Sequence, residues 1–477
     1  MLTYSFSDIG SDSLYEHLYK CIRNDITQGF LKPGDKLPSK RTFAKNLGIS
    51  VITIENAYDQ LISEGYVYSI CKKGYFVADF LKNIKVKIEA THQLNTSIQE
   101  SDPLYIADFV SNRTLKEYFP FTIWAKILRE CLHDYQDKVL VNTPSGGALV
   151  LRKAIAKHLH DFRGMNVDPE QIVVGTGTEY LYGQIVQLLG HDKIYGVEDP
   201  GYFKMASVYE ANGVKVKYIK MDSDGISVKE LENENISVAH ISPSHQFPTG
   251  VITSISKRYE LLSWAAKLDN RYIIEDDYDS EFRMIGRPIP SLQSIDTIEK
   301  VIYLNTFSKS ITPTLRISYM VLPKQLVNLY YKKLSFYSCP VTTLIQIALA
   351  RFISEGYFEK HINRMRNYYK KQRDFLVNLF NESEVRDRVK ICEEDAGLHF
   401  VIRLDIEMPD KEFVDVMLRN SIKLSALSEY YFNNQNKSEH AFVINYSSLT
   451  EDQIRKAIDV MTKVIVQCKS KKKINKT

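Results

Sequence analysis

Lys309 lies in the stretch Asn305–Tyr319 of the 477-residue chain, where the residue types and their spacing point most clearly to a chemical function. Thr306 lies three residues before this lysine, and Arg316 lies seven residues after it. Burial lowers the pKa of a lysine, and the neutral amine then forms a Schiff base with an aldehyde. An arginine can hold phosphate oxygens through two parallel hydrogen bonds. The stretch therefore predicts a site for pyridoxal 5'-phosphate (PLP); the alternative is an exposed Ser-Lys-Ser loop beside a structural arginine.

Two turns supply further groups that such a cofactor needs. Ile172–Leu181 runs from a strand through glycines into a helix, so that Gly177 and Thr178 present amides and a hydroxyl where a phosphate binds well. An ordinary strand-to-helix turn fits this pattern equally. Glu198–Tyr202 is a sharp turn that presents Tyr202, whose ring can stack on a pyridine face. A tyrosine in a turn is, however, more often simply a surface residue.

The acids of Ile273–Phe282 follow a predicted buried strand. A carboxylate against the pyridine nitrogen keeps that nitrogen protonated. We assign this role to Asp276, and the hydrogen bond to the ring hydroxyl to Tyr278. A metal site is the alternative, but no His or Cys lies close to these acids in the sequence, so we expect no metal. Ser242–Gly250 ends another strand, where ligands of open α/β sheets gather.

Elements that could position these groups alternate along the chain from about residue 105. Runs rich in β-branched residues are separated by helical patterns, which favours a mainly parallel sheet with helices on both faces. A long helical stretch is predicted over roughly Thr342–Asn381, and a smaller α+β subdomain over about 382–466. The predicted strands of the sheet are Gln171–Gly175, Lys193–Glu198, Val214–Met221, Ser237–Ser242, Arg271–Asp276, Val301–Asn305 and Ile317–Leu322.

Residues 1–80 have a different organisation. The pattern predicts helices over 13–28, from Ser39 to Leu47, and over Val51–Glu64, followed by a β-hairpin over Tyr66–Val77. Two helices joined by a turn and followed by a two-stranded wing form a DNA-binding arrangement. A helical protein-interaction module is the alternative. Residues 81–104 are polar and without periodicity, which predicts a linker between this domain and residues 105–477.

The predicted DNA contacts fall into three groups. The basic stretch 32–45 predicts phosphate contacts near a helix N-terminus, the start of the second helix predicts contacts to base edges, and the wing tip predicts contacts to the DNA backbone. The three groups are Ser39, Lys40 and Arg41; Ser50, Ile52, Thr53 and Asn56; and Lys72, Lys73 and Gly74.

Bulk composition is ordinary for a globular protein. Hydrophobic residues make up 44% and charged residues 25%, and the net charge of +4 does not by itself indicate nucleic acid. The six cysteines are scattered, which is typical of reduced thiols. We expect no secretory signal and no membrane span, and hence a cytoplasmic protein.

Residues 10–78 resemble the winged helix-turn-helix of GntR-type bacterial regulators, except that Val51 stands where many members have an arginine. Residues 105–466 resemble fold-type-I aminotransferases, and the combination is the layout of the MocR regulators. The resemblance implies a homodimer in which Lys309 binds the cofactor aldehyde, Asp276 contacts the ring nitrogen, Tyr278 the ring hydroxyl and Tyr202 the ring face. It also implies a set of residues around the phosphate, namely Thr178, Thr306, Ser308 and Arg316.

The sequence also departs from the aminotransferase pattern. Aminotransferases usually have an asparagine just before Pro-Thr-Gly, and we expect His245 to replace it here. The arginine that holds a substrate carboxylate near the chain end has no clear counterpart. Arg403 and Lys204 are therefore predicted as effector-binding residues.

These features predict a PLP-dependent transcriptional regulator. It would sense an amine, an amino acid or PLP itself at Lys309, and would change the arrangement of two DNA-binding heads in a dimer on an operator. The alternatives are a working aminotransferase that carries a DNA-binding domain, and a dimerisation scaffold without a cofactor.

Overall fold

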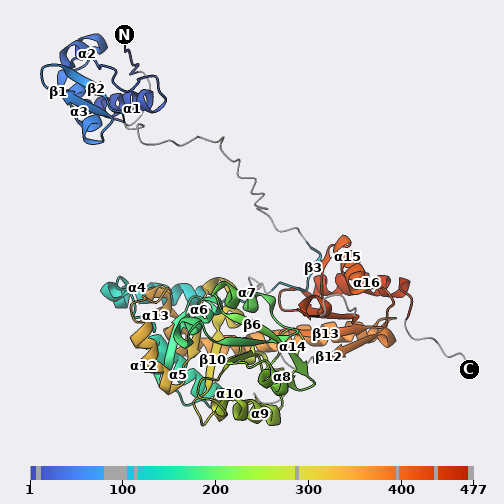
Figure 1. Ribbon diagram of the computed structural model, residues 1–477. Helices are drawn as coiled ribbons and strands as arrows, with labels where there is room; N and C mark the ends of the chain where they lie inside the picture. The colour runs from blue at the N-terminus through green and yellow to red at the C-terminus, as the bar shows by residue number, and fades with distance from the viewer. Residues whose placement is uncertain are drawn as a thin grey trace, which may run out of the picture. The chain divides into compact units, whose positions relative to one another are not determined.

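The computed structural model describes residues 2–6, 12–79, 105–111, 117–284, 289–393, 397–433 and 439–470. The chain forms two compact units, Met1–Ser101 and Asp102–Thr477, which Figure 1 draws in blue and in cyan to red. The division between the units falls within the predicted linker 81–104. That stretch lies outside the described residues, so the linker and the exact domain bounds stay predictions.

The first unit contains three helices and a hairpin. These are α1 (Leu14–Thr27), α2 (Lys40–Leu47), α3 (Val51–Ser63), β1 (Val67–Ile70) and β2 (Gly74–Val77). Its core is formed by apolar residues at helical spacing, such as Leu18 and Ile22 of α1 against Ile54 and Tyr58 of α3. The antiparallel hairpin pairs Val67 with Val77. The elements match the predicted winged helix-turn-helix.

Capping residues fix where the two helices of the helix-turn-helix begin. The Ser39 side chain accepts a hydrogen bond from the Thr42 backbone, and Ser50 accepts one from Thr53. Such caps satisfy amides that the helix leaves without partners. Gly48, in a left-handed conformation (φ 68°), ends α2 and turns the chain toward α3.

The second unit is built on an eight-stranded sheet of order β4-β11-β10-β9-β8-β5-β6-β7. Neighbouring strands from β10 to β6 run parallel, while β11 and β7 are antiparallel to their neighbours. The predicted, mainly parallel sheet is confirmed. The strands are β4 (Ile172–Gly175), β5 (Ile194–Asp199), β6 (Lys215–Asp222), β7 (Gly225–Ile226), β8 (Val238–Ile241), β9 (Tyr272–Asp276), β10 (Val301–Thr306) and β11 (Ser318–Val321).

Helices cover both faces of this sheet (Figure 1). One face packs against α6, α7 and α12 through residues such as Ile185, and the other packs against α8 and α9 through residues such as Trp264. The helices around the sheet are α4 (Phe121–Val139), α5 (Leu149–Arg163), α6 (Thr178–Leu189), α7 (Phe203–Ala211), α8 (Val228–Asn233), α9 (Ile255–Ala266), α10 (Leu292–Ile295), α11 (Phe307–Ser310), α12 (Lys324–Leu334) and α13 (Thr343–Ser354).

A smaller part closes the chain around a four-stranded sheet of order β12-β13-β16-β15. The first three of these strands pair antiparallel along their length, for example Phe400 with Ile444. A two-residue parallel pair joins β14 to β3. The elements are β3 (Ala107–Asp108), α14 (Tyr357–Glu382), β12 (Val389–Cys392), β13 (His399–Leu404), α15 (Asp410–Arg419), β14 (Ile422–Lys423), β15 (Ser425–Ala426), β16 (Ala441–Asn445) and α16 (Glu451–Gln467).

The long helical stretch predicted over Thr342–Asn381 is helical in the structure, but it is divided. Two helices, α13 and α14, occupy this stretch, and Gly356 separates them with φ 76°. A left-handed residue cannot continue an α-helix, and glycine adopts that conformation at the lowest cost. Among the described helices, none combines the length and apolarity that crossing a membrane would require.

Candidate cofactor site and DNA-binding surface

A cavity of about 230 Å³ opens at the carboxyl ends of the parallel strands, with Lys309 in its wall. Lys309 lies on α11, the short helix that follows β10 directly. Nine of the ten residues predicted to bind the cofactor line this cavity. They are Gly177, Thr178, Tyr202, Asp276, Tyr278, Thr306, Ser308, Lys309 and Arg316.

Lys309 is suited to nucleophilic chemistry because burial lowers the pKa of its amine to about 8. The carboxylate of Asp279 acts in the opposite direction but does not offset the burial. A larger fraction of neutral amine is therefore present near pH 7 than on an exposed lysine.

One end of the cavity is suited to a phosphate. Gly177 and Thr178, where α6 begins, line it, and the Arg316 guanidinium lies so close to Gly177 that a Cβ there would be 2.8 Å from Nη2. Arg316 itself has left-handed backbone angles (φ 52°, ψ 39°), which are rare for a residue with a side chain. Thr306 caps α11 by accepting a hydrogen bond from the Ser308 backbone at 3.1 Å.

The opposite end holds Asp276, the last residue of β9. Its Oδ2 accepts a hydrogen bond from the Tyr182 hydroxyl at 2.8 Å and lies 3.6 Å from Nε2 of His240. Tyr209 in turn hydrogen-bonds Nδ1 of that histidine at 2.8 Å. Oδ1 of Asp276 is buried and has no hydrogen-bond partner among the described residues. A buried carboxylate oxygen without a donor fits the protonated nitrogen of a pyridine ring.

Strand geometry explains why Asp276 alone among the neighbouring acids faces the cavity. Successive side chains alternate between the faces of a strand, so Glu275 and Asp277 point the other way. Asp277 there forms a fully buried ion pair with Arg163 at 2.8 Å, and Glu275 accepts hydrogen bonds from the Leu292 and Gln293 amides.

His245 does not occupy the place that we expected. Its Nδ1 lies 2.9 Å from the Asp279 carboxylate, and the imidazole is not in the wall of the Lys309 cavity. The residue that lines the cavity is Phe247, which stands directly before Pro248. In this structure the buried carboxylate of Asp279 is the partner of the histidine, and a contact of His245 with the cofactor stays a prediction. His399 packs on the same imidazole at 4.4 Å between ring centres.

Tyr278 and Tyr202 lie in the cavity wall, as predicted. The Tyr278 hydroxyl donates to the His245 carbonyl oxygen at 2.9 Å and lies 3.3 Å from Nδ1 of the same residue. A phenolic oxygen that donates in this way can still accept a hydrogen bond from a ring hydroxyl. Burial holds the pKa of Tyr278 well above its usual range, and the group is neutral. Tyr202 precedes α7, is 49% exposed, and meets Phe247 edge to face.

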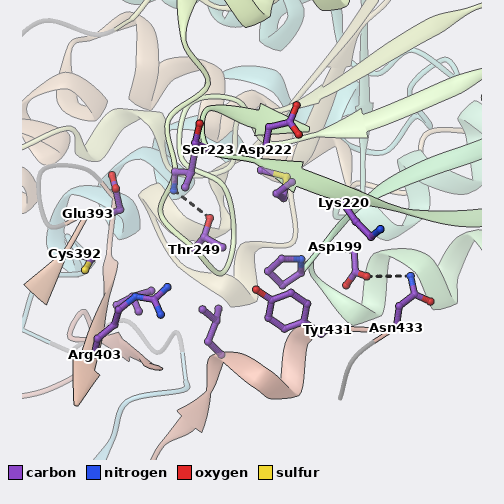
Figure 2. A pocket seen from close by; sticks show the side chains of 15 residues that line it. Asp199, Lys220, Asp222, Ser223, Thr249, Cys392, Glu393, Arg403, Tyr431 and Asn433 are labelled. Atoms are coloured by element: carbon purple, nitrogen blue, oxygen red, sulfur yellow. Dashed lines mark hydrogen bonds between the residues drawn. The ribbon is translucent and has the colours of Figure 1, made fainter. Parts of the chain in front are cut away.

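Neither predicted effector residue lines the Lys309 cavity. Nζ of Lys204 forms an ion pair with Glu179 at 2.5 Å. Arg403, on β13, lines a separate cavity of about 480 Å³ between the carboxyl ends of β5 and β6 and the smaller sheet (Figure 2). Lys204 is directed to Glu179 although its neighbour Met205 lines the cavity, and Arg403 lies on a strand of the smaller sheet.

Five further residues line the Lys309 cavity that the sequence reasoning did not single out: Tyr182, Glu198, Met205, Ser242 and Phe247. Signals for three of them were present. Tyr182 lies one helical turn after Thr178, Glu198 opens the Glu-Asp-Pro-Gly-Tyr turn, and Phe247 precedes Pro-Thr-Gly. Burial raises the pKa of Glu198 to about 8, so this cavity contains a largely protonated acid at neutral pH.

Predicted DNA contacts on the first unit fall into two groups. Arg41, Ile52, Asn56, Lys72 and Lys73 are exposed, and Ile52 exposes 68% of its surface although it is apolar. An apolar side chain in this position can meet a thymine methyl group.

The other predicted contact residues include several that already interact with side chains of the same unit. Lys40 bridges to Glu55 at 2.7 Å and lies over the Tyr75 ring, and its contact with phosphate stays a prediction. Ser39 and Ser50 act as helix caps and share their hydroxyls with Thr42 and Thr53, respectively. Gly74 begins β2 at the wing tip with φ 112°.

Comparison with known proteins agrees with this architecture. Residues 111–461 match the family described as aminotransferase class I and II, and residues 14–77 match the bacterial regulatory proteins of the gntR family. The fold is similar to that of a kynurenine aminotransferase from Pyrococcus horikoshii, with a TM-score of 0.67 and 25% identity over 76% of this chain and 91% of that one.

Regulators match over nearly the whole length. The chain is 34% identical to the uncharacterised HTH-type transcriptional regulator YdeL of Bacillus subtilis over 93% of this chain and 95% of that protein. It is 29% identical to the probable rhizopine catabolism regulatory protein MocR of Rhizobium meliloti, over 96% and 94% respectively. It is 28% identical to the pyridoxine biosynthesis regulator PdxR of Corynebacterium glutamicum, over 93% and 94%.

A winged helix-turn-helix and an aminotransferase-like unit on one chain define a DNA-binding transcriptional regulator built on an enzyme fold. The chain belongs to the MocR-type regulators, in which a GntR-type domain is fused to an aminotransferase class I and II domain.

Proposed function

We propose that the second unit binds PLP at Lys309 and that occupancy of this site by the cofactor, or by the cofactor with a small amine or amino acid, changes DNA binding by the first unit. The observation that carries the proposal is the Lys309 cavity. A lysine of lowered pKa, a phosphate-binding turn and an acid with a partnerless buried oxygen surround one volume of about 230 Å³.

The residues have distinct tasks in this proposal. PLP supplies an aldehyde that condenses with amines, and the protein supplies position and charge. Arg316, Thr306 and the amides at the start of α6 hold the phosphate. Asp276 holds a proton on the ring nitrogen, while Tyr202 and Phe247 confine the ring faces. Lys309 would offer the protein's own amine to the aldehyde, and an effector amine would compete with it for the same position.

The cavity favours a sensor over an enzyme that turns over many substrates. Among the described residues that line it, Arg316 is the only arginine, and it lies at the phosphate end. A substrate carboxylate would therefore have no second guanidinium in this wall to bind it. Phe247 also brings an apolar ring to the place where an aminotransferase has an asparagine.

A homodimer is part of the proposal, and an apolar surface supports it. Leu140, Val141 and Phe336 are exposed by 83%, 64% and 74%. The segments that carry these residues are hydrogen-bonded to each other. The Thr343 hydroxyl donates to the Val141 carbonyl oxygen, and the Cys339 amide donates to the Thr143 carbonyl oxygen. Exposed apolar residues that gather on one surface are typical of an interface.

Substitution of Lys309 by alanine tests the proposal. The full-length variant should acquire no visible absorption band when PLP is added, and its affinity for DNA should no longer respond to PLP or to amines. The measurement combines absorption spectra with DNA binding by fluorescence anisotropy, using DNA selected from a random pool by the wild-type protein.

The matched control is Lys193→Ala, which removes a lysine outside the cavity that pairs with Asp192. This variant should behave as the wild type in both measurements. An unchanged DNA response to PLP and amines in Lys309→Ala would overturn the proposal. Sustained transfer of amino groups between an amino donor and a keto acid by the wild type would favour the enzyme.

A further inference from the structure

Glu179, which the predicted cofactor site does not include, lies beside Arg316, a residue that lines the Lys309 cavity. It is the second residue of α6 and follows Thr178 directly. Its Oε1 is 2.5 Å from Nζ of Lys204, and its Oε2 is 3.5 Å from Nη2 of Arg316. The Glu179 carboxylate thus contacts both Arg316 and Lys204 of α7, the helix that begins directly after Tyr202.

This carboxylate is ionised at neutral pH. The hydrogen bond from Lys204 is the largest cause that lowers the pKa of Glu179, and Arg316 adds to it. The start of a helix attracts anions because its amides lack partners. At the start of α6 the protein therefore places a negative charge of its own, next to the cation that a phosphate would use.

Two opposing effects follow for a phosphate-bearing ligand. Arg316 is held in place against Gly177 at the phosphate end, which favours binding. A phosphate that binds there must share this guanidinium with Glu179 and lie close to a like charge, which weakens binding. Because Glu179 is 37% exposed, water screens the repulsion and makes its effect moderate.

We propose that Glu179 competes with the phosphate of PLP for Arg316 and thereby sets the affinity for PLP. Occupancy of Lys309 then follows the concentration of the cofactor. The inference rests on the proposed function, because it names how the same site is regulated. A regulator that bound PLP too tightly would stay saturated. If a local charge lowers the affinity, the fraction of protein that holds PLP changes with the concentration of PLP.

The variant Glu179→Gln tests the inference, with PLP and pyridoxal as probes. Both aldehydes can react with Lys309, but only PLP carries the phosphate. We expect the substitution to lower the Kd for PLP about three- to tenfold, the effect of one partly screened charge, and to leave the Kd for pyridoxal within about twofold of the wild type. Both values are measured by absorption titration of the full-length protein.

Glu234→Gln is the matched control. Glu234 is also an exposed carboxylate paired with a lysine, since it lies 3.0 Å from Lys217, but it is at the end of α8 and outside the cavity. This variant should leave both Kd values unchanged. An unchanged or higher Kd for PLP in Glu179→Gln, or an equal decrease for PLP and pyridoxal, would overturn the inference.

Failure of the proposed function would give a different result. In that case the wild type itself would show no saturable PLP binding that Lys309→Ala abolishes. If the wild type binds PLP through Lys309 and Glu179→Gln has no selective effect on PLP, only the role of Glu179 is wrong.

Discussion

At the scale of single residues, the site depends on how burial changes the charge of a few groups. Burial lowers the pKa of Lys309 to about 8 and raises that of Glu198 to about 8. The charged form of each group is disfavoured because the cavity wall replaces water. The same cavity therefore contains an amine that readily loses its proton and an acid that keeps its own.

The lowered pKa of Lys309 predicts how cofactor capture depends on pH. Below about pH 8 the amine is mainly protonated and has no lone pair for the aldehyde, so the rate should rise nearly tenfold per pH unit from 6 to 7. Above pH 8 the rate should level off, because the amine is already neutral. Stopped-flow absorption after mixing with PLP measures this.

A free lysine derivative is the control for that experiment, since its rate should continue to rise toward pH 10.5. A rate for the protein that follows the free lysine, without a plateau above pH 8, would contradict the lowered pKa.

The residue types and their order predicted most of the site, because the segments Gly-Thr, Pro-Gly-Tyr, Glu-Asp-Asp-Tyr and Ser-Lys each lie at the end of a strand or just after it. Parallel strands bring their carboxyl ends to one edge of the sheet, so the groups meet. Side-chain direction was harder to predict. His245 turned away because Asp279, 34 positions further along the chain, provides it with a buried partner, and spacing in the sequence does not reveal such a contact.

At the scale of elements, runs of β-branched residues between helical patterns were enough to predict the seven main strands, and helical spacing predicted the helices of the first unit. The short strands β3, β7, β14 and β15 were missed, since two residues are too few for a periodic pattern. The break at Gly356 was also missed, because the apolar pattern continues on both sides of the glycine.

The turn between β4 and α6 provides a prediction at this scale. In Gly177→Ala, the new Cβ would lie 2.8 Å from the Arg316 guanidinium, and φ of 88° disfavours a side chain. We expect the Kd for PLP to rise about tenfold or more, which corresponds to the loss of about one charge-assisted hydrogen bond. PLP titration of the full-length protein measures this.

Gly164→Ala is a suitable comparison for that variant. Gly164 also has positive φ (66°), but no atom lies within 4 Å of the position of a Cβ. It should destabilise the protein by about 1 kcal/mol and leave PLP binding unchanged. Equal PLP affinities of the two variants would show that the contact with Arg316 does not matter.

At the scale of the whole molecule, the proposed dimer carries two winged heads. Two heads contact two half-sites whose separation is set by the helical repeat of DNA. In DNA selected by the full-length protein, an insertion of about 5 base pairs between the half-sites should lower affinity tenfold or more, because it rotates one half-site to the opposite side of the duplex. An insertion of about 10 base pairs should cost less.

Electrophoretic mobility and anisotropy assays give both affinities, and sedimentation of the free protein gives its oligomeric state. A monomeric protein whose binding is insensitive to either insertion would contradict the arrangement of two heads. The polar stretch 81–104 would then have to be tested as a tether for a single head.

The glycine between α13 and α14 has a mechanical consequence for signal transmission. Helix α13 packs on α4 and α5 beside the large sheet, whereas α14 packs on α16 of the smaller part. Gly356 is therefore the junction between a helix packed beside the large sheet and the 26-residue helix packed on the smaller part. A shift of the smaller part on ligand binding would reach α13 through this junction.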